Sequence, residues 1–343
     1  MGARLIPIIF IRRRYIIMNT LLRRAAVVGC GSISGNHGRA IEAMEGVELV
    51  ACADIKFDRA ETFAKTFGGK PYETLEAMLD AEQIDVLHIC TPHYLHPVMI
   101  ELALSKGLHV FSEKPPVITG EALDRLQSLD GIDKVGVCFQ NRWNPATVRV
   151  KAVLASGELG KPLGIRAFVT WNRGASYYTD SGWRGQISTE GGGVLVNQSI
   201  HTLDLMLQFM GTPDLSEAIY TNFHLKDIIE VEDTIAAHMQ FGDAKGLFYA
   251  TTAYSTDSPV IIEINCEKGS VRIDGTDVGI QKNGEWAFEK MEEPATGAKG
   301  YWGNGHLRCI EDYYKCMNAG VAFDSSFMSA VPTMACMLKL LDR

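Results

Sequence analysis

The amino-acid sequence predicts an α/β protein, with a doubly wound parallel sheet in its first part and an α+β domain after it. Three observations predict this fold class. Short apolar segments alternate with helical segments as far as residue 140, a glycine motif follows the first apolar segment, and later segments alternate polar with apolar residues. The length of 343 residues, 46% of them hydrophobic, is sufficient for two domains.

The first domain, expected over residues 21–141, alternates strands and helices along its whole length. Each expected strand is an almost wholly apolar run, as is typical of strands buried on both faces of a sheet. The expected strands are 24–30, 47–54, 84–91, 109–114 and 134–140, and the expected helices are 35–46, 57–69, 74–80, 96–107 and 119–131. This regular alternation predicts a parallel, doubly wound sheet.

The turn after the first expected strand has the motif G-x-G-x-x-S, formed by Gly29, Gly31 and Ser34. The two glycines allow a tight turn and leave room for a pyrophosphate at a helix N-terminus. Asp54 ends the second expected strand, and a carboxylate there binds an adenosine ribose and repels a 2′-phosphate. The motif therefore predicts a dinucleotide site that favours NAD, with NADP as the alternative because Lys56 is close to Asp54.

Polar residues also follow the third and fourth expected strands, and ligands of open parallel sheets bind beyond the carboxyl ends of strands. Lys114 is followed directly by two prolines, which restrict the backbone and hold the lysine in place. The expected cofactor contacts are Gly29, Gly31, Ser32, Ile33, Asp54, Thr91, Pro92, His93, His96, Glu113, Lys114 and Gln140.

The second domain, expected over residues 142–325, begins with a helix at 144–160 and continues with strands. The expected strands are 164–172, 216–225, 232–242, 245–255 and 260–275. Short glycine- and aspartate-containing turns join several of them, which predicts antiparallel pairing with one face buried and one face free. Residues 326–343 are expected to form a C-terminal helix that packs back on the first domain.

Residues 195–210 are expected to form one buried helix, because apolar residues cover most of its circumference. Asn197, His201, Asp204 and Gln208 fall within about 60° of one another on this helix. A buried polar stripe must find partners. It forms either an internal hydrogen-bond network or one side of a polar cavity, with Asn197 and His201 at the site. The preceding glycines 191–193 would let backbone approach a ligand.

Four segments of the sequence resemble the glucose–fructose oxidoreductase / inositol dehydrogenase / rhizopine catabolism (Gfo/Idh/MocA) family. They are VVGCGSISGNH, CTPHYLH followed by GLHVFSEKPP, GGGVLVNQSIHTLDLMLQFMG, and GNGHLRCIEDYYKCMNAG. The resemblance implies an NAD(P)-binding Rossmann domain and an α/β domain with a large open, mostly antiparallel sheet that pairs subunits into dimers or tetramers. It also implies oxidation of a sugar or cyclitol hydroxyl, a Lys114 that contacts substrate and nicotinamide, and a cis Lys114–Pro115 bond.

Oxidation of a secondary alcohol removes a hydride from carbon and a proton from oxygen. A neutral His201 imidazole is suited to accept the proton, and a Lys114 ammonium would stabilise the negative charge on that oxygen. Many family members carry aspartate four residues before the histidine, where this chain has Asn197. An amide does not relay protons, so we expect Asn197 and Gln198 to bind substrate hydroxyls or the nicotinamide. Without that carboxylate, His201 should be less basic than in the relatives with aspartate.

Aromatic and arginine side chains precede the three glycines, and such side chains either pack together or bind a sugar ring that carries an anionic group. The pattern W-x-R, YY, WRG, GGG and NQ-x-x-H is similar to the family's nucleotide-sugar branch, such as the dehydrogenases of UDP-N-acetylglucosaminuronate. His306 is expected to start a helix near the site. The expected substrate contacts are Asn141, Arg142, Arg173, Tyr178, Trp183, Arg184, Gln198 and His306.

Two other functions remain open on the residues alone: a redox glycosidase that retains NAD, and a non-catalytic NADH-binding regulator. The glycosidase branch has a Gly-Gly-His signature, which glycines 191–193 lack, and retention of Lys114 and His201 disfavours a regulator. The net charge of −8 argues against nucleic-acid binding.

The cysteines lack C-x-x-C spacing and indicate reduced thiols of a cytoplasmic protein with no metal site. Residues 1–20 are expected to be a disordered leader, because their apolar run is too short to span a bilayer and has its arginines on the wrong side for a secretory signal.

Overall fold

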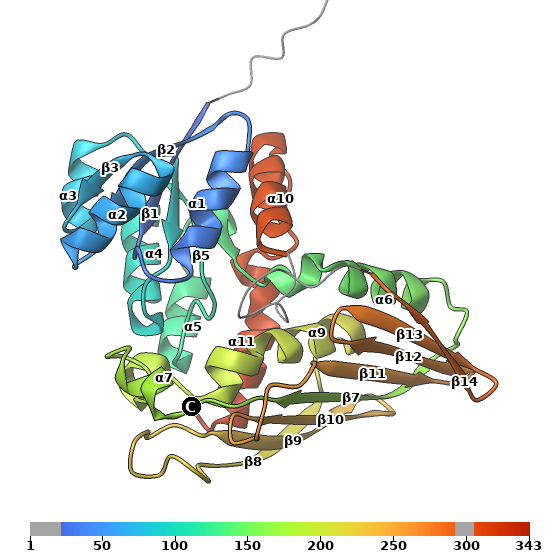
Figure 1. Cartoon of the computed structure of the whole chain (residues 1–343). Helices are drawn as coiled ribbons and strands as arrows, with labels where there is room; N and C mark the ends of the chain where they lie inside the picture. Colours follow the sequence, from blue (N-terminus) through green and yellow to red (C-terminus); the bar gives the residue numbers. More distant parts are fainter. Residues whose placement is uncertain (1–21, 292–304) are drawn as a thin grey trace, which may run out of the picture.

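The computed structural model describes residues 22–291 and 305–343, arranged as two lobes connected by helices (Figure 1). The first lobe is built around a parallel sheet and the second around a larger sheet. The expected leader, 1–20, lies outside the described residues. Within the described residues, no helix combines the length and apolar character that crossing a membrane requires.

Six parallel strands form the first sheet, in the order β3-β2-β1-β4-β5-β6. Their bounds are β1 (Arg23–Val28), β2 (Val47–Ala53), β3 (Lys70–Tyr72), β4 (Val86–Ile89), β5 (His109–Ser112) and β6 (Val135–Val137). The strand order reverses between β1 and β4, which opens a crevice beyond their carboxyl ends. The edge strand β3 was not expected, because it has three residues and contains Pro71, which only an edge strand tolerates.

Five helices connect these strands: α1 (Ser34–Ala43), α2 (Phe57–Phe67), α3 (Leu75–Ala81), α4 (His96–Ser105) and α5 (Gly120–Gln127). Helix α1 begins directly after the glycine motif, so its N-terminal N–H groups lie at the carboxyl end of β1. The hydroxyls of Thr74 and Thr119 accept hydrogen bonds from Ala77 N and Ala122 N, which cap α3 and α5. The predicted doubly wound sheet is confirmed.

Eight strands form the second sheet, in the order β14-β13-β12-β11-β7-β10-β9-β8, and only the β7–β10 pair is parallel. The bounds are β7 (Pro162–Thr170), β8 (Leu215–Thr221), β9 (Thr234–Phe241), β10 (Ala244–Thr251), β11 (Ile261–Cys266), β12 (Gly269–Asp274), β13 (Asp277–Lys282) and β14 (Glu285–Glu289). The predicted mostly antiparallel sheet is therefore confirmed. Strands β13 and β14 were missed because both are short and carry charged residues.

Three helices cover one face of this sheet: α6 (Pro145–Ala155), α9 (Ile200–Met210) and α11 (Phe327–Leu340). Their apolar residues merge with those of the sheet and of the first lobe into one core. On the opposite face, Ile219, Leu247 and Phe288 are exposed. Beside them, Glu263 forms ion pairs with Arg166 and Arg272.

The segment predicted as one α-helix over 195–210 has two parts. A π-helix, η4 (Val194–Ser199), precedes the α-helix α9. The wider turn changes the angle between successive side chains, and π-helical turns occur frequently at functional sites. Asn197 and His201 therefore do not lie on one regular α-helical stripe. Further along α9, Asp204 pairs with Arg142 and Gln208 accepts a hydrogen bond from Lys151 Nζ.

The last two helices bring the chain back to the first lobe (Figure 1, red). Helix α10 (Gly305–Ala319) packs on α1, and α11 packs on both α5 and α9. The backbone of Val137 in β6 donates to the Ser325 carbonyl, which ties the start of α11 to the parallel sheet. Residues 305–319, expected to belong to the second domain, thus pack against the first.

Candidate active site

A cleft of about 1530 Å³ lies between the carboxyl ends of the parallel strands and the η4–α9 segment. Most of the residues expected to bind cofactor or substrate line it, although they come from both lobes. Those residues are Gly29, Gly31, Ser32, Ile33, Asp54, Thr91, Pro92, His93, Glu113, Lys114, Gln140, Arg173, Trp183, Arg184, Asn197, Gln198, His201 and His306.

The glycine motif at one end of the cleft fits a dinucleotide. Gly29 has φ +86°, and a Cβ there would lie 2.7 Å from the backbone of Cys90, so this turn requires glycine. At Gly31 no atom lies within 4 Å of a Cβ position, which leaves open space beside the start of α1. An exposed helix N-terminus beside an open glycine backbone is suited to a pyrophosphate.

Asp54 lies at the end of β2 and lines the same end of the cleft. Its Oδ2 accepts a hydrogen bond from Cys30 N and its Oδ1 one from Lys56 N, both at 2.8 Å. The carboxylate is thus fixed against the glycine motif by backbone donors. This geometry places a negative charge where a ribose hydroxyl of a bound NAD would be recognised.

Lys114 lines the cleft from the segment that follows β5. The Lys114–Pro115 peptide bond is cis, as the resemblance implied. Its Nζ donates to the Asn197 carbonyl oxygen at 2.6 Å, which joins the two lobes across the cleft. Burial lowers the pKa of Lys114 to about 8, although the neighbouring Glu113 carboxylate opposes this shift.

Glu113, directly before the lysine, ends a buried chain of polar groups. Its Oε1 lies 3.1 Å from His37 Nε2, and His37 Nδ1 lies 2.9 Å from Nδ1 of His88. The chain continues to the Tyr314 hydroxyl, 2.9 Å from His88 Nε2. Burial alone would raise the pKa of Glu113, but its contact with His37 holds that pKa well below its usual value.

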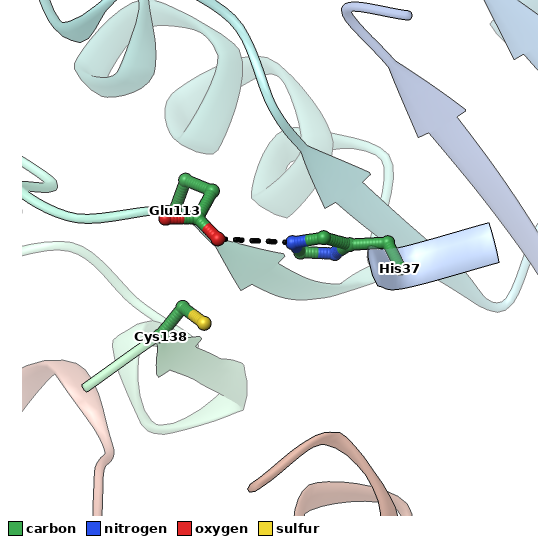
Figure 2. A group of neighbouring side chains, drawn as sticks. All are labelled: His37, Glu113 and Cys138. Carbon is green, nitrogen blue, oxygen red and sulfur yellow. Dashed lines mark hydrogen bonds and ion pairs between the residues drawn. The ribbon is translucent and has the colours of Figure 1, made fainter. Parts of the chain in front are cut away.

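Cys138 points toward the same His37–Glu113 pair from the end of β6 (Figure 2). The ligand-type atoms of the three side chains lie within 4.8 Å of one another, a spacing that a metal ion could bridge. The direct contact between His37 and Glu113 satisfies both groups without an ion. The chain of polar groups fixes the Glu113 carboxylate beside Lys114, and burial raises the pKa of the Cys138 thiol.

His201 lies at the start of α9 and is 2% exposed. Its Nε2 is 3.4 Å from the Gln140 side-chain nitrogen, and its ring meets Phe139 edge-on. Burial, and then the nearby Lys114 ammonium, lower the pKa of His201 well below 6.5. The imidazole is therefore neutral at physiological pH and has the capacity to accept a proton from a ligand in the cleft.

Aromatic and amide side chains form the wall of the cleft contributed by the second lobe. The Arg184 guanidinium lies 4.5 Å from the centre of the Tyr177 ring and 4.9 Å from that of Trp183. Gln198 Nε2 donates to the Tyr177 hydroxyl at 2.9 Å. Among the described residues, Arg184 Nε and Gln198 Oε1 are buried without a hydrogen-bond partner. Buried unsatisfied atoms lining a cleft indicate that a polar ligand belongs there.

Four residues expected at the site lie elsewhere. Arg142 is 3% exposed, and its guanidinium pairs with Asp204 and donates to the Ser329 hydroxyl, so it joins α9 and α11 and does not line the cleft. Tyr178 is buried against Thr252. Both ring nitrogens of His96 lie within 2.8 Å of backbone carbonyls. Asn141 accepts a hydrogen bond from Thr147 through its carbonyl and does not line the cleft.

The expectation that glycines 191–193 approach a ligand is also corrected. A Cβ on Gly193 would lie 1.9 Å from the Glu232 carbonyl oxygen, and a Cβ on Gly191 would lie 2.4 Å from Ile118. These glycines allow close packing of protein backbone, and none of them lines the cleft. Glu232 also accepts hydrogen bonds from Gly193 N and Leu195 N, which fix the start of η4.

Two residues that the sequence prediction omitted belong to the site. Tyr177 lines the cleft where its neighbour Tyr178 was expected, and the adjacent tyrosines offer no local signal to distinguish them. Glu190 is fully buried behind the cleft, where its carboxylate contacts Asn197. No sequence pattern singled out Glu190, so only its contacts reveal it.

Comparison with known proteins agrees with this geometry. Residues 23–140 match the family described as "Oxidoreductase family, NAD-binding Rossmann fold", and residues 147–272 match the "GFO/IDH/MocA C-terminal domain". The chain is 28% identical over 203 residues to glucose-6-phosphate 3-dehydrogenase of Bacillus subtilis, covering 58% of this chain and 57% of the relative. It is 30% identical over 196 residues to D-glucoside 3-dehydrogenase of Escherichia coli, covering 55% and 54%.

The matched regions thus span little more than half the length of these curated relatives. A solved structure matches over nearly the whole chain: the WlbA dehydrogenase from Bordetella pertussis in complex with NADH and UDP-GlcNAcA. Its TM-score is 0.80 at 28% identity, covering 94% of this chain and 96% of that one. The two family matches are consecutive and together cover more than half of the sequence. The chain therefore belongs to the Gfo/Idh/MocA oxidoreductase family, with residues 23–140 as its NAD-binding Rossmann domain.

Proposed function

We propose that the protein is an NAD-dependent dehydrogenase that oxidises a secondary hydroxyl of a sugar, a cyclitol or a nucleotide sugar. The observation that carries this proposal is the shared cleft. Lys114, Asn197 and His201 line the same space as the glycine motif and Asp54. When bound, NAD supplies the hydride acceptor. The named relatives, which are sugar dehydrogenases, support this reaction type.

Each residue at the centre of the cleft has a distinct task in this reaction. His201, neutral because of its burial and of Lys114, accepts the hydroxyl proton. Lys114, as an ammonium, stabilises the negative charge that develops on the same oxygen. Asn197 and Gln198 bind neighbouring hydroxyls or the nicotinamide. Arg184 and Tyr177 offer a planar cationic and aromatic surface to the rest of the substrate.

The substrate class that we favour is a nucleotide sugar with an anionic sugar ring. Arg184 and Lys114 line the cleft and give it positive charge, whereas the guanidinium of Arg173, which also lines it, is paired with Asp257. Trp183 and Arg184 also line a smaller hollow of about 580 Å³ beside Gly31 and Ser32, so this segment faces the cofactor side as well. The WlbA neighbour, solved with UDP-GlcNAcA, supports this choice.

Rapid mixing of the NAD-bound protein with a panel of sugars tests the proposal. We expect an absorbance increase of NADH with at least one uronic acid, sugar or nucleotide sugar. Cleavage of a glycoside without net NADH formation would indicate a redox glycosidase instead. Binding of NADH without any reduction across the panel would indicate a regulator, and either outcome would overturn the dehydrogenase proposal.

Replacing Asp54 with serine should shift cofactor preference toward NADP. The substitution removes the carboxylate that opposes a 2′-phosphate, while Lys56 and Arg59 remain in the cleft. Removing one such repulsion is worth roughly 2 kcal/mol, so the NADP/NAD ratio of kcat/KM should rise about 10- to 100-fold. Steady-state kinetics with both cofactors measures the ratio. An unchanged ratio would show that Asp54 does not select the cofactor.

Activity should fall as pH rises through about 8, because burial lowers the pKa of Lys114 to that value and the ammonium form is present only below it. His201 adds no acid limb near neutrality, since its pKa lies well below 6.5. Several titratable groups lie close enough to Lys114 for their charges and its charge to shift one another's pKa values. They are His93, His96, Glu113, Cys138, Arg184, Glu190, His201 and His306.

A pH profile of kcat/KM from 6 to 10 checks this expectation. Lys114→Arg should lose the alkaline limb, because a guanidinium keeps its charge in this range. An alkaline limb that persists in Lys114→Arg would assign it to another group.

We also propose that the protein is a cytoplasmic homodimer or homotetramer paired through the free face of the second sheet. The open face of the second sheet supports such pairing: Ile219, Leu247 and Phe288 expose apolar side chains there from three separate strands, and contact with a second copy would remove this apolar surface from water. Sedimentation analysis of Leu247→Lys against the unmodified protein tests it. A monomeric unmodified protein would refute the proposed pairing.

A further inference from the structure

Glu190 is a carboxylate that the reaction as described does not use. It ends the short helix α8 (Ile187–Glu190) and is 0% exposed. Its Oε2 accepts a hydrogen bond from Gly185 N at 2.6 Å, and its Oε1 accepts one from Asn197 Nδ2. Its carbonyl oxygen accepts a third from His93 Nδ1 at 2.8 Å. Glu190 therefore contacts the segment that carries Arg184, the η4 helix, and His93 of the first lobe.

The contact with Asn197 determines which end of that amide faces the cleft. Because Nδ2 donates one of its two N–H groups to Glu190, the oxygen Oδ1 is turned away from Glu190 and is the acceptor that Asn197 can offer to a ligand. Asn197 lines the cleft, and its backbone carbonyl accepts the hydrogen bond from Lys114 Nζ. The carboxylate behind the amide thus keeps a hydrogen-bond acceptor directed at the site and holds the backbone that positions the lysine.

We propose that Glu190 is a positioning residue of the active site: its carboxylate holds Asn197 with the amide oxygen toward substrate and places a negative charge close to Lys114. This role rests on the proposed dehydrogenase function. Relatives with aspartate at position 197 carry a carboxylate there. In this chain the carboxylate belongs to Glu190, seven residues earlier, and contacts the Asn197 amide from the side away from the cleft. Glu190 itself does not line the cleft.

The electrostatics around Glu190 agree with this role. Burial raises the pKa of Glu190 to about 7, while hydrogen bonds from Gly185 and Asn197 and the charge of Arg184 lower it. The carboxylate carries its negative charge above about pH 7, and that charge raises the pKa of Lys114. The other titratable groups that face it are Glu232, Tyr177 and Tyr178.

Exchanging the carboxylate and the amide between positions 190 and 197 tests the proposal. In Glu190→Gln, the glutamine oxygen accepts from Gly185 N and its amide nitrogen faces Asn197, so Asn197 must turn and present Nδ2 to the cleft. We expect kcat/KM to fall about 100-fold, as misplaced catalytic groups typically cause. In the double variant Glu190→Gln/Asn197→Asp, the glutamine nitrogen donates to the new carboxylate and an acceptor again faces the cleft. We expect it to regain most of the loss.

Asn197→Asp alone places two carboxylates in contact, and the repulsion should raise the apparent pKa of the pair. Its pH profile should therefore shift to higher pH. Wild-type kinetics in Glu190→Gln, or a double variant no better than Glu190→Gln, would overturn the proposal. Circular dichroism and NADH binding establish that each variant is folded.

Measuring the pKa of Lys114 does not require turnover, so it tests the role of Glu190 separately from the proposed dehydrogenase activity. The pKa of Lys114 follows from the pH dependence of its acylation, measured by mass spectrometry. We expect Glu190→Gln to lower this pKa and the double variant to restore it. If no sugar reduces NAD in the wild-type protein, the dehydrogenase proposal fails, and the Lys114 measurement still decides the role of Glu190. An unchanged Lys114 pKa in Glu190→Gln would count against it.

Discussion

Replacing His201 with alanine should reduce turnover by about 100- to 10,000-fold, the usual contribution of a positioned general base. The imidazole is neutral, lines the same cleft as Lys114 and is affected by the charge of that lysine, so alanine leaves the hydroxyl proton without this acceptor. Binding of NADH should persist, because the glycine motif and Asp54 lie at the other end of the cleft. Stopped-flow reduction of NAD and fluorescence titration with NADH measure the two effects.

The matched control is His109→Ala, which removes a histidine at the amino end of β5 that does not line the cleft and should leave both quantities unchanged. Full turnover in His201→Ala would end the assignment of His201 as the base. Loss of NADH binding together with turnover would instead show that His201 has a structural role, since the residue is buried against Phe139.

Replacing Lys114 with methionine should lower kcat by about 100- to 1000-fold, similar to the removal of one donor to a developing oxyanion. Methionine retains an unbranched apolar stem and removes only the ammonium. The variant also loses the hydrogen bond to the Asn197 carbonyl, so part of the loss should appear in KM. Steady-state kinetics separates the two parameters.

Lys114→Arg is the control for charge, because it keeps a cation but changes its shape. Partial activity in the arginine variant and little in the methionine variant would support electrostatic stabilisation. Equal kcat in Lys114→Met and the wild-type protein would refute it. Since Lys114 and His201 act in one step, the double variant should lose less than the product of the two single losses.

The parallel sheet and the position of the cleft could be predicted from local patterns. Apolar strand segments, the glycine motif and the polar residues at strand ends each depend on a few neighbouring residues, and the carboxyl ends of parallel strands meet at one edge. For this reason the glycine motif, Asp54, Thr91 and Lys114 were all placed correctly at the cleft. His201 was predicted to lie at the cleft because it follows Asn197 by four residues in an otherwise apolar segment.

Errors arose where a side chain's partner is far away in the sequence. Arg142 was expected at the substrate because cations suit an anionic sugar, yet its partner Asp204 lies 62 residues further along. Tyr177 and Tyr178 are adjacent and chemically identical, so only the turn of a short helix, α7 (Ala175–Thr179), decides which one reaches the cleft. The three glycines were assigned to a ligand, although other protein atoms approach them instead: Ile118 at Gly191, Val196 at Gly192 and the Glu232 carbonyl at Gly193.

The sequence by itself determined the nucleotide-binding lobe and the sheet of the second lobe, and it marked Lys114 and His201 as candidates for the site, because each of these depends on periodicity or on a motif whose spacing is local. Only the tertiary structure decided the π-helical turn that orients Asn197, the pairing of Arg142 with Asp204, and the placement of Glu190 behind the amide. These depend on the packing of segments that are brought together by folding, and burial then decides which polar groups must pair with each other and which remain for a ligand.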